Sequence, residues 1–149
     1  MTDASTGATV RIERHIAAPP ERVFAAWLDP ASMARWLSPI GHAEAAVEPT
    51  VGGRLRVTMI GDGRRIEHTG EYREVDPHRR LVFTWQSPYT GPNPSLVTIE
   101  LTARDDGTDL VLTHEFLPAD AVDSHAGGWG SMLDRLAAEL ATPSMDVVA

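Results

Sequence analysis

The chain has 149 residues, enough for one domain with a buried core, and it contains no cysteine, which excludes thiol nucleophiles, disulfides and cysteine metal clusters. Thirteen basic against twenty-one acidic residues give a net charge of −8, which disfavours nucleic acid and anionic membrane surfaces as partners. No apolar run approaches bilayer length and residues 1–8 lack the apolar core of a signal peptide, so we expect a soluble cytoplasmic protein.

We expect three segments: a flexible N-terminus at 1–8, one domain at 9–141 and a C-terminal tail at 142–149. The domain opens with Val10, Ile12 and Ile16 alternating with polar residues, which predicts a half-buried strand. Two short helices are predicted next, at Glu21–Leu28 and Ala31–Leu37, because prolines precede each and their apolar residues share one face.

Six strand-like stretches then follow at hairpin spacing, separated by turns rich in glycine and aspartate. They are His42–Glu48, Arg54–Ile60, Arg65–Val75, Arg80–Gln86, Ser95–Ala103 and Asp109–Phe116. Six strands in succession predict an antiparallel meander. Only the connector 87–94, reading SPYTGPNP, is long and proline-rich.

One long helix is predicted from Pro118 to Leu140, with Asp120 as its N-cap. Its apolar residues recur at i, i+3, i+4 and i+7, and they are Trp129, Met132, Leu133, Leu136, Ala137 and Leu140. Glycines 127, 128 and 130 are expected to let the helix approach the sheet closely. A sheet wrapped around one helix leaves gaps where inward side chains are too small, so we predict an α+β fold with a ligand cavity.

The predicted site lies where strand alternation turns aromatic and imidazole side chains toward the helix. We expect the ligand to contact His68, Tyr72, Phe83, Trp85, His114, Trp129 and Leu133. Indole faces stack on flat rings, so the expected partner is a small, apolar or aromatic, uncharged molecule. Ligand binding is expected to quench the fluorescence of Trp85 and Trp129. The other two tryptophans, Trp27 and Trp36, are expected to lie away from the site.

No catalytic residue is identified by pattern. His68 and His114 are the candidate general bases, because imidazole titrates near neutrality, although an inward histidine is more often a satisfied core residue. The six histidines show no HExxH or His-x-His spacing and no G-x-S-x-G elbow is present, so we expect no metal and no cofactor. A homodimer is the default expectation for assembly.

Five stretches of the sequence, taken with the order of the predicted elements, are typical of one known family. They are "RHIAAPPERVFAAWLDPASMARWL", "VGGRLRVTM", "GEYREVDPHRRLVFTWQS", "TDLVLTHEFLP" and "GGWGSMLDRLAAEL". In these features the chain resembles bacterial proteins related to the C-terminal domain of the activator of Hsp90 ATPase, in the START-like or SRPBCC (Bet v 1-like) superfamily. The resemblance covers about residues 9 to 141, nearly the whole chain.

This resemblance implies a helix-grip fold, in which a curved antiparallel sheet holds a C-terminal helix across a hydrophobic cavity. The superfamily includes lipid carriers, plant hormone receptors, aromatic polyketide cyclases and oxygenase domains, so one cavity shape serves several chemistries. We expect ligand binding first, a polyketide cyclase or dehydratase-like enzyme as the alternative, and an Hsp90-type co-chaperone or stress-related interaction protein after that. A chaperone partner is the least expected, because that activity in the eukaryotic relatives also involves an N-terminal domain for which this chain has no room.

Overall fold

The computed structural model describes residues 7–141, so residues 1–6 of the predicted N-terminus and the predicted tail 142–149 lie outside the described residues. Strand β1 (Ala8–Ile16) is followed by two short helices, α1 (Pro20–Ala26) and α2 (Pro30–Trp36). The remaining elements are β2 (His42–Val47), β3 (Arg54–Gly61), β4 (Arg64–Asp76), β5 (Arg80–Trp85), β6 (Ser95–Arg104), β7 (Gly107–Leu117), the 3-10 turn η1 (Ala119–Ala121) and α3 (Val122–Ala141).

The strands form one seven-stranded antiparallel sheet in the order β1-β7-β6-β5-β4-β3-β2. From β2 to β7 each strand pairs with its neighbour in sequence, which confirms the predicted meander, and β1 joins the far side of β7. The β3–β4 connection is a two-residue turn, with φ of 52° at Asp62 and 73° at Gly63. Aspartate and glycine tolerate these left-handed angles, which match the twist of the flanking strands and place Arg64 directly after the turn.

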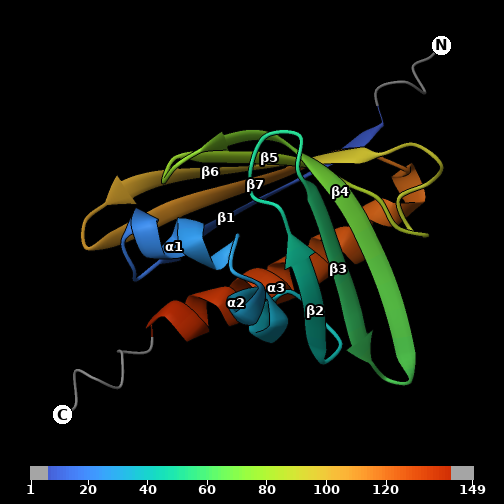
Figure 1. Cartoon of the computed structure of the whole chain (residues 1–149), viewed down its shortest axis with the longest axis horizontal. Coiled ribbons are helices and arrows are strands. Elements are labelled where there is room, and N and C mark those ends of the chain that lie inside the picture. The colour runs from blue at the N-terminus through green and yellow to red at the C-terminus, as the bar shows by residue number, and fades with distance from the viewer. Residues whose placement is uncertain (1–6, 142–149) are drawn as a thin grey trace.

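Helix α3 runs beneath the arched sheet, with α1 and α2 near its C-terminal half (Figure 1). It lies along β1, where the Arg14 guanidinium is 2.9 Å from the Asp134 carboxylate, while α2 packs against β2 at the opposite edge of the sheet. Arg35 of α2 donates to Glu139 of α3 at 2.9 Å, which ties the two helices together. Both edge strands are therefore covered, and the predicted α+β helix-grip arrangement is confirmed.

The face that α3 turns to the sheet is the predicted apolar stripe. Its buried members are Trp129, Met132, Leu133, Leu136 and Leu140, whereas Ala137 is half-buried. The α-helix begins at Val122 and not at Pro118, because the Ala121 amide donates to the Pro118 carbonyl at 2.9 Å and winds a 3-10 turn first. The predicted N-cap, Asp120, lies inside that turn.

Gly70 marks a close approach between β4 and β5. A Cβ atom at this position would lie 1.9 Å from the Thr84 carbonyl oxygen, so no other residue fits without moving a strand. Nearby, the Thr84 hydroxyl accepts a hydrogen bond of 2.9 Å from the Glu71 amide, and the β4–β5 register shifts between Tyr72 and Glu74. The irregularity bends the sheet beside the candidate site.

Candidate functional site

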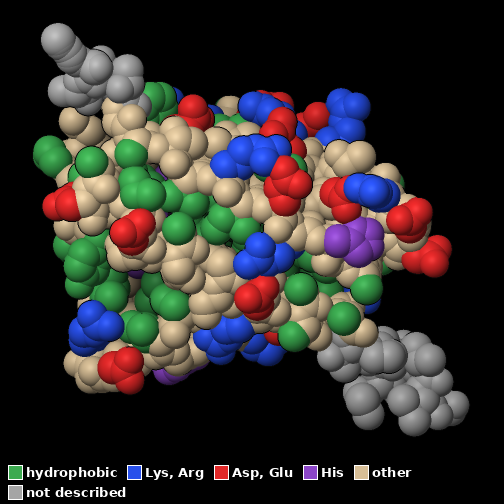
Figure 2. Space-filling view, turned by 180° about the vertical axis from the view of Figure 1, so that it is seen from behind, with side chains coloured by type: hydrophobic (Ala, Val, Ile, Leu, Met, Phe, Trp, Pro, Cys, Tyr) green, Lys and Arg blue, Asp and Glu red, His purple; other side chains and the backbone are tan. Residues whose placement is uncertain are grey.

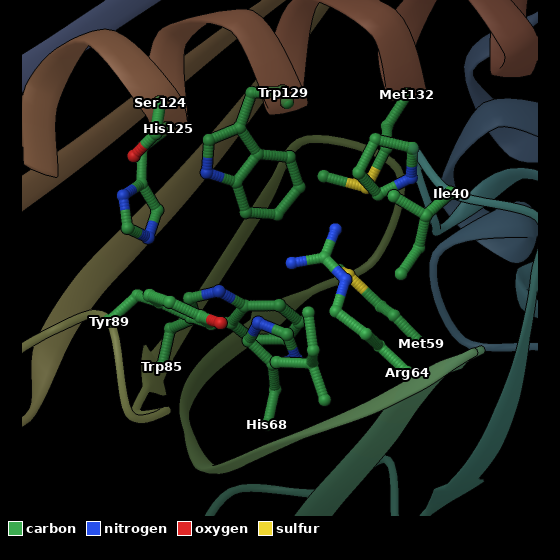
Figure 3. Close-up of a pocket in the computed structure, with 13 residues that line it drawn as sticks. Ile40, Met59, Arg64, His68, Trp85, Tyr89, Ser124, His125, Trp129 and Met132 are labelled. Atoms are coloured by element: carbon green, nitrogen blue, oxygen red, sulfur yellow. The ribbon is translucent and has the colours of Figure 1, made fainter. Parts of the chain in front are cut away.

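A cavity of about 230 Å³ lies between α3 and the inner face of β3, β4 and β5 (Figure 3). Its lining side chains come from α3 on one side and from the sheet on the other. The α2–β2 connection and the 87–94 loop contribute the remaining lining residues. The lining residues are Pro39, Ile40, Met59, Arg64, Ile66, His68, Trp85, Tyr89, Ser124, His125, Gly128, Trp129 and Met132. This volume is below the range of roughly 300–1,000 Å³ usual for drug-sized ligands.

Three of the seven predicted site residues, His68, Trp85 and Trp129, line this cavity together. The other four are buried in the core and do not line it; they are Tyr72, Phe83, His114 and Leu133. Tyr72 and Phe83 lie on the same sheet face as the cavity residues, but their rings pack edge-on against each other with centroids 6.2 Å apart. The Phe83 ring also lies 6.3 Å, centroid to centroid, from the Trp27 ring. Trp27, at the end of α1, thus fills the space in front of them.

Burial raises the pKa of the Tyr72 phenol, so this group stays protonated. Its hydroxyl has no hydrogen-bond partner within the described residues. Because Tyr72 lies outside the cavity lining, its hydroxyl is not among the groups that meet a ligand there.

His68 forms one wall of the cavity. Its ring stacks on Trp85, with centroids 4.6 Å apart and planes 25° from parallel. Burial lowers the pKa of His68 to about 4, so the imidazole is neutral at physiological pH. Its Nδ1 atom is buried and has no hydrogen-bond partner among residues 7–141. A buried, unpaired polar atom costs about 1–3 kcal/mol.

His114 is held in a hydrogen-bonded chain behind the cavity. The Trp129 indole N–H donates to His114 Nδ1 at 2.9 Å, and His114 Nε2 lies 2.7 Å from the Ser95 hydroxyl. Since Nδ1 accepts, Nε2 carries the proton and donates to Ser95, whose hydroxyl donates in turn to the Trp85 carbonyl. Burial lowers the pKa of His114 to about 3. With both nitrogens engaged and the ring neutral, His114 holds Trp129 in place.

His125 lies on the cavity wall although the sequence did not single it out. Its Nδ1 donates to the Ala121 carbonyl at 2.8 Å, which leaves a lone pair on Nε2. Its ring packs edge-on against His114, with centroids 5.2 Å apart. Figure 3 shows the imidazole extending from α3 toward the sheet side of the cavity. Extending the apolar stripe one turn toward the N-terminus from Trp129 reaches His125, so the signal was present in the helical spacing.

Arg64 is the second residue that sequence reasoning missed. Strand alternation places residues 64, 66 and 68 on one face, but the predicted strand began at Arg65 and so omitted Arg64. Met59 shares this face because it pairs directly with Ile66 across β3 and β4. Tyr89 reaches the cavity from an irregular loop, where no periodicity could indicate it.

The glycines of α3 correct one expectation. A Cβ atom at Gly127 or Gly128 would meet nothing within 4 Å, so these residues do not serve a close approach between helix and sheet. At Gly130 the nearest atom is the tip of the Arg14 side chain at 3.4 Å. Gly128 lines the cavity, and the missing side chain contributes to its volume, whereas Gly127 is exposed.

Replacing Gly127 or Gly128 with alanine should therefore stabilise the protein. Each change should raise the free energy of unfolding by about 0.5–1 kcal/mol, because alanine loses less backbone entropy than glycine in a helix interior. Chemical denaturation of the two single variants measures the effect. A loss of stability at either position would mean that the helix packs more tightly there than the geometry indicates.

The four tryptophans form one continuous chain of ring contacts. The ring centroids are 4.7 Å apart for Trp36 and Trp27, 6.1 Å apart for Trp27 and Trp129, and 5.6 Å apart for Trp129 and Trp85. Trp27 and Trp36 do not line the cavity, but Trp27 is close to it because its ring contacts that of Trp129. Changes in indole emission therefore cannot be assigned to the two cavity tryptophans alone.

Among residues 7–141, no three histidine, aspartate or glutamate side chains gather closely enough to share a metal ion. None of the helices within that range combines the length and apolar character needed to span a membrane.

The comparisons with solved structures support the fold. Protein CV1439 from Chromobacterium violaceum is 31% identical, with a TM-score of 0.80 over 91% of this chain and 98% of that one. DynU16, a protein in the dynemicin biosynthetic locus, is 29% identical with a TM-score of 0.75 over 90% of this chain, which spans 47% of DynU16. PFC0360w, an HSP90 activator from Plasmodium falciparum, is 24% identical with a TM-score of 0.75. The match covers 92% of this chain and 99% of PFC0360w, and at this identity it shows the fold alone.

Among curated proteins, no sequence matches the chain. The sequence pattern of one family does match, over residues 17–141, and this range holds α1, α2, strands β2 to β7 and α3. The matched range includes every residue of the cavity lining. The chain therefore belongs to the family described as activator of Hsp90 ATPase homolog 1-like proteins.

Proposed function

We propose that the protein binds a small, largely apolar aromatic molecule in the cavity between α3 and strands β3 to β5. The observation that carries this proposal is the pair of indoles in the lining, Trp85 and Trp129, whose ring centroids are 5.6 Å apart. Aromatic rings pack on indole faces in offset or edge-on arrangements at such separations. The volume of about 230 Å³ suits a ligand of one or two fused rings.

Binding without covalent chemistry fits the two histidines that the sequence offered as bases. His114 has no free lone pair and does not line the cavity. His68 lines it, but with its pKa lowered to about 4 it is a weak base at neutral pH. The arrangement therefore favours recognition by shape and stacking.

The test uses 2-naphthamide, a neutral two-ring probe, and isothermal titration calorimetry. Gly128→Leu should weaken binding roughly tenfold or more, because the new side chain occupies space that the ring needs. Gly127→Leu is the matched control: it adds the same side chain one residue earlier on α3, at an exposed position, and should leave affinity unchanged. Equal affinity in the two variants would place the bound ring outside this cavity.

Proton-transfer catalysis of the cyclase or dehydratase type is the second candidate. It is favoured by His125, whose Nε2 lone pair is not used by the Ala121 contact and whose side chain lines the cavity. Mass spectrometry of aromatic polyketide-like compounds incubated with the protein tests for turnover. This candidate requires turnover that His125→Gln abolishes while 2-naphthamide binding survives.

A further inference from the structure

Within residues 7–141, Arg64 differs from most arginines of this protein in having no carboxylate partner. All thirteen basic residues are arginine, and nine of them form ion pairs with aspartate or glutamate. Figure 2 shows the result on one face, where arginine and acidic side chains lie interspersed. Within residues 7–141, only Arg22, Arg54 and Arg64 have neither an ion pair nor a side-chain hydrogen bond.

Of these three, only Arg64 lines the cavity. It is the first residue of β4, and the Asp62–Gly63 turn fixes the point at which the strand begins. In Figure 3 its guanidinium lies between Met132 and Trp129 on the helix side and His68 and Met59 on the sheet side. An unpaired cation thus stands next to the aromatic walls in a protein whose net charge is −8.

A second, independent observation lies in the same cavity. His68 is 5% exposed, and its buried Nδ1 atom has no hydrogen-bond partner among the described residues. His125 adds an Nε2 lone pair, because its other nitrogen is bound to the Ala121 carbonyl. An ionised carboxylate only accepts hydrogen bonds, so of the polar groups in this cavity the Arg64 guanidinium has the charge and the donors that match it, while Trp85 and Trp129 supply the aromatic walls.

We infer that the ligand is an aromatic carboxylic acid, whose ring lies against Trp85 and Trp129 and whose carboxylate is bound by the Arg64 guanidinium. This inference rests on the proposed function and adds the charge of the ligand to it. The planar guanidinium can donate two parallel N–H hydrogen bonds to one carboxylate, a geometry that an ammonium or a neutral amide lacks. A carboxylate differs from the uncharged ligand expected from the sequence, because Arg64 brings a positive charge to the cavity lining.

The test compares two probes of the same shape, 2-naphthoate and 2-naphthamide, which differ in carrying a carboxylate or a neutral amide. Calorimetry at pH 7 and low salt should show the parent protein binding naphthoate at least about fivefold more tightly than naphthamide, since charge-assisted hydrogen bonds from a guanidinium to a carboxylate are stronger than hydrogen bonds to a neutral amide. Salt at 1 M should reduce the preference by screening the charges. Arg64→Gln should abolish it by weakening naphthoate while leaving naphthamide within about twofold, and Arg64→Lys should restore part of it.

Arg54→Gln is the matched control, because Arg54 is also exposed and unpaired but lies outside the cavity lining. It changes the net charge by the same amount and should keep the preference for naphthoate intact. Equal affinities of the parent for the two probes, or a preference that survives Arg64→Gln, would overturn the assignment of Arg64 while leaving the proposed function standing. If neither probe binds the parent, the proposed function fails and the inference fails with it.

Discussion

Lowering the pH from 7 to 5 should reduce the free energy of unfolding by roughly 4 kcal/mol, because two histidines are buried in their neutral form. Burial lowers the pKa of His68 to about 4 and that of His114 to about 3, against an ordinary value of 6.5. The unfolded chain therefore binds more protons than the folded protein below pH 6.5. The stabilisation from these two groups is full above that pH and is lost as the pH falls toward 4 for His68 and toward 3 for His114.

Urea denaturation at pH 7, 6 and 5 measures this loss, and carboxylates titrate mostly below the window. His68→Phe keeps an aromatic ring against Trp85 but cannot take up a proton. Between pH 7 and pH 5, the free energy of unfolding of this variant should therefore fall only about half as much as that of the parent. His42→Gln is the control, since His42 is exposed at the start of β2, and it should show the full loss. Equal stability of the parent at pH 7 and 5 would mean that neither buried imidazole is held neutral by the fold.

Leu136→Ala should lower the free energy of unfolding by roughly 2–5 kcal/mol. Leu136 is fully buried at the centre of the stripe that α3 turns to the core, and alanine leaves a void that the surrounding strands can only partly close. Helix propensity cannot be the cause of a loss, because alanine is the strongest helix former. Chemical denaturation at pH 7 gives the value.

Ser131→Ala is the control for this effect. Ser131 is exposed on α3, so its replacement should change stability by no more than about 0.5 kcal/mol. A loss below about half a kcal/mol for Leu136→Ala would place that face of the helix in solvent. Leu136 does not line the cavity, so the variant should also bind 2-naphthamide with unchanged affinity if it remains folded.

Much of the architecture could be predicted from local patterns. Period-two alternation and glycine-containing turns indicate the six successive strands, and the i, i+3, i+4, i+7 stripe of the last helix indicates which side faces the sheet. These patterns work because each arises within one element, where backbone geometry alone decides which residues share a face. Boundaries were less accurate, as with the 3-10 turn at 119–121, because a hydrogen bond between residues three apart forms there in place of the α-helical bond between residues four apart.

The candidate site was predicted only in part, since alternation gives the face of a strand but not the depth of each residue along it. Tyr72 and His68 share one face of β4, yet only His68 meets the cavity, because Trp27 from α1 packs against Phe83 at the other end. The sequence placed His114 and Trp129 in one site but did not indicate that they would hydrogen bond to each other, or that His114 would bond to Ser95, because these partners lie 15 and 19 residues away.

The sequence by itself therefore determined the strands, the long helix and the apolar side that the helix turns inward. Tertiary structure alone decided which inward side chains are packed and hydrogen-bonded in the core and which line the cavity. His114 became part of the core through two hydrogen bonds, while Arg64 was left beside two indoles with no partner for its side chain among the described residues. The physical reason is that a cavity is the volume that several elements fail to fill together, and no single element encodes that volume.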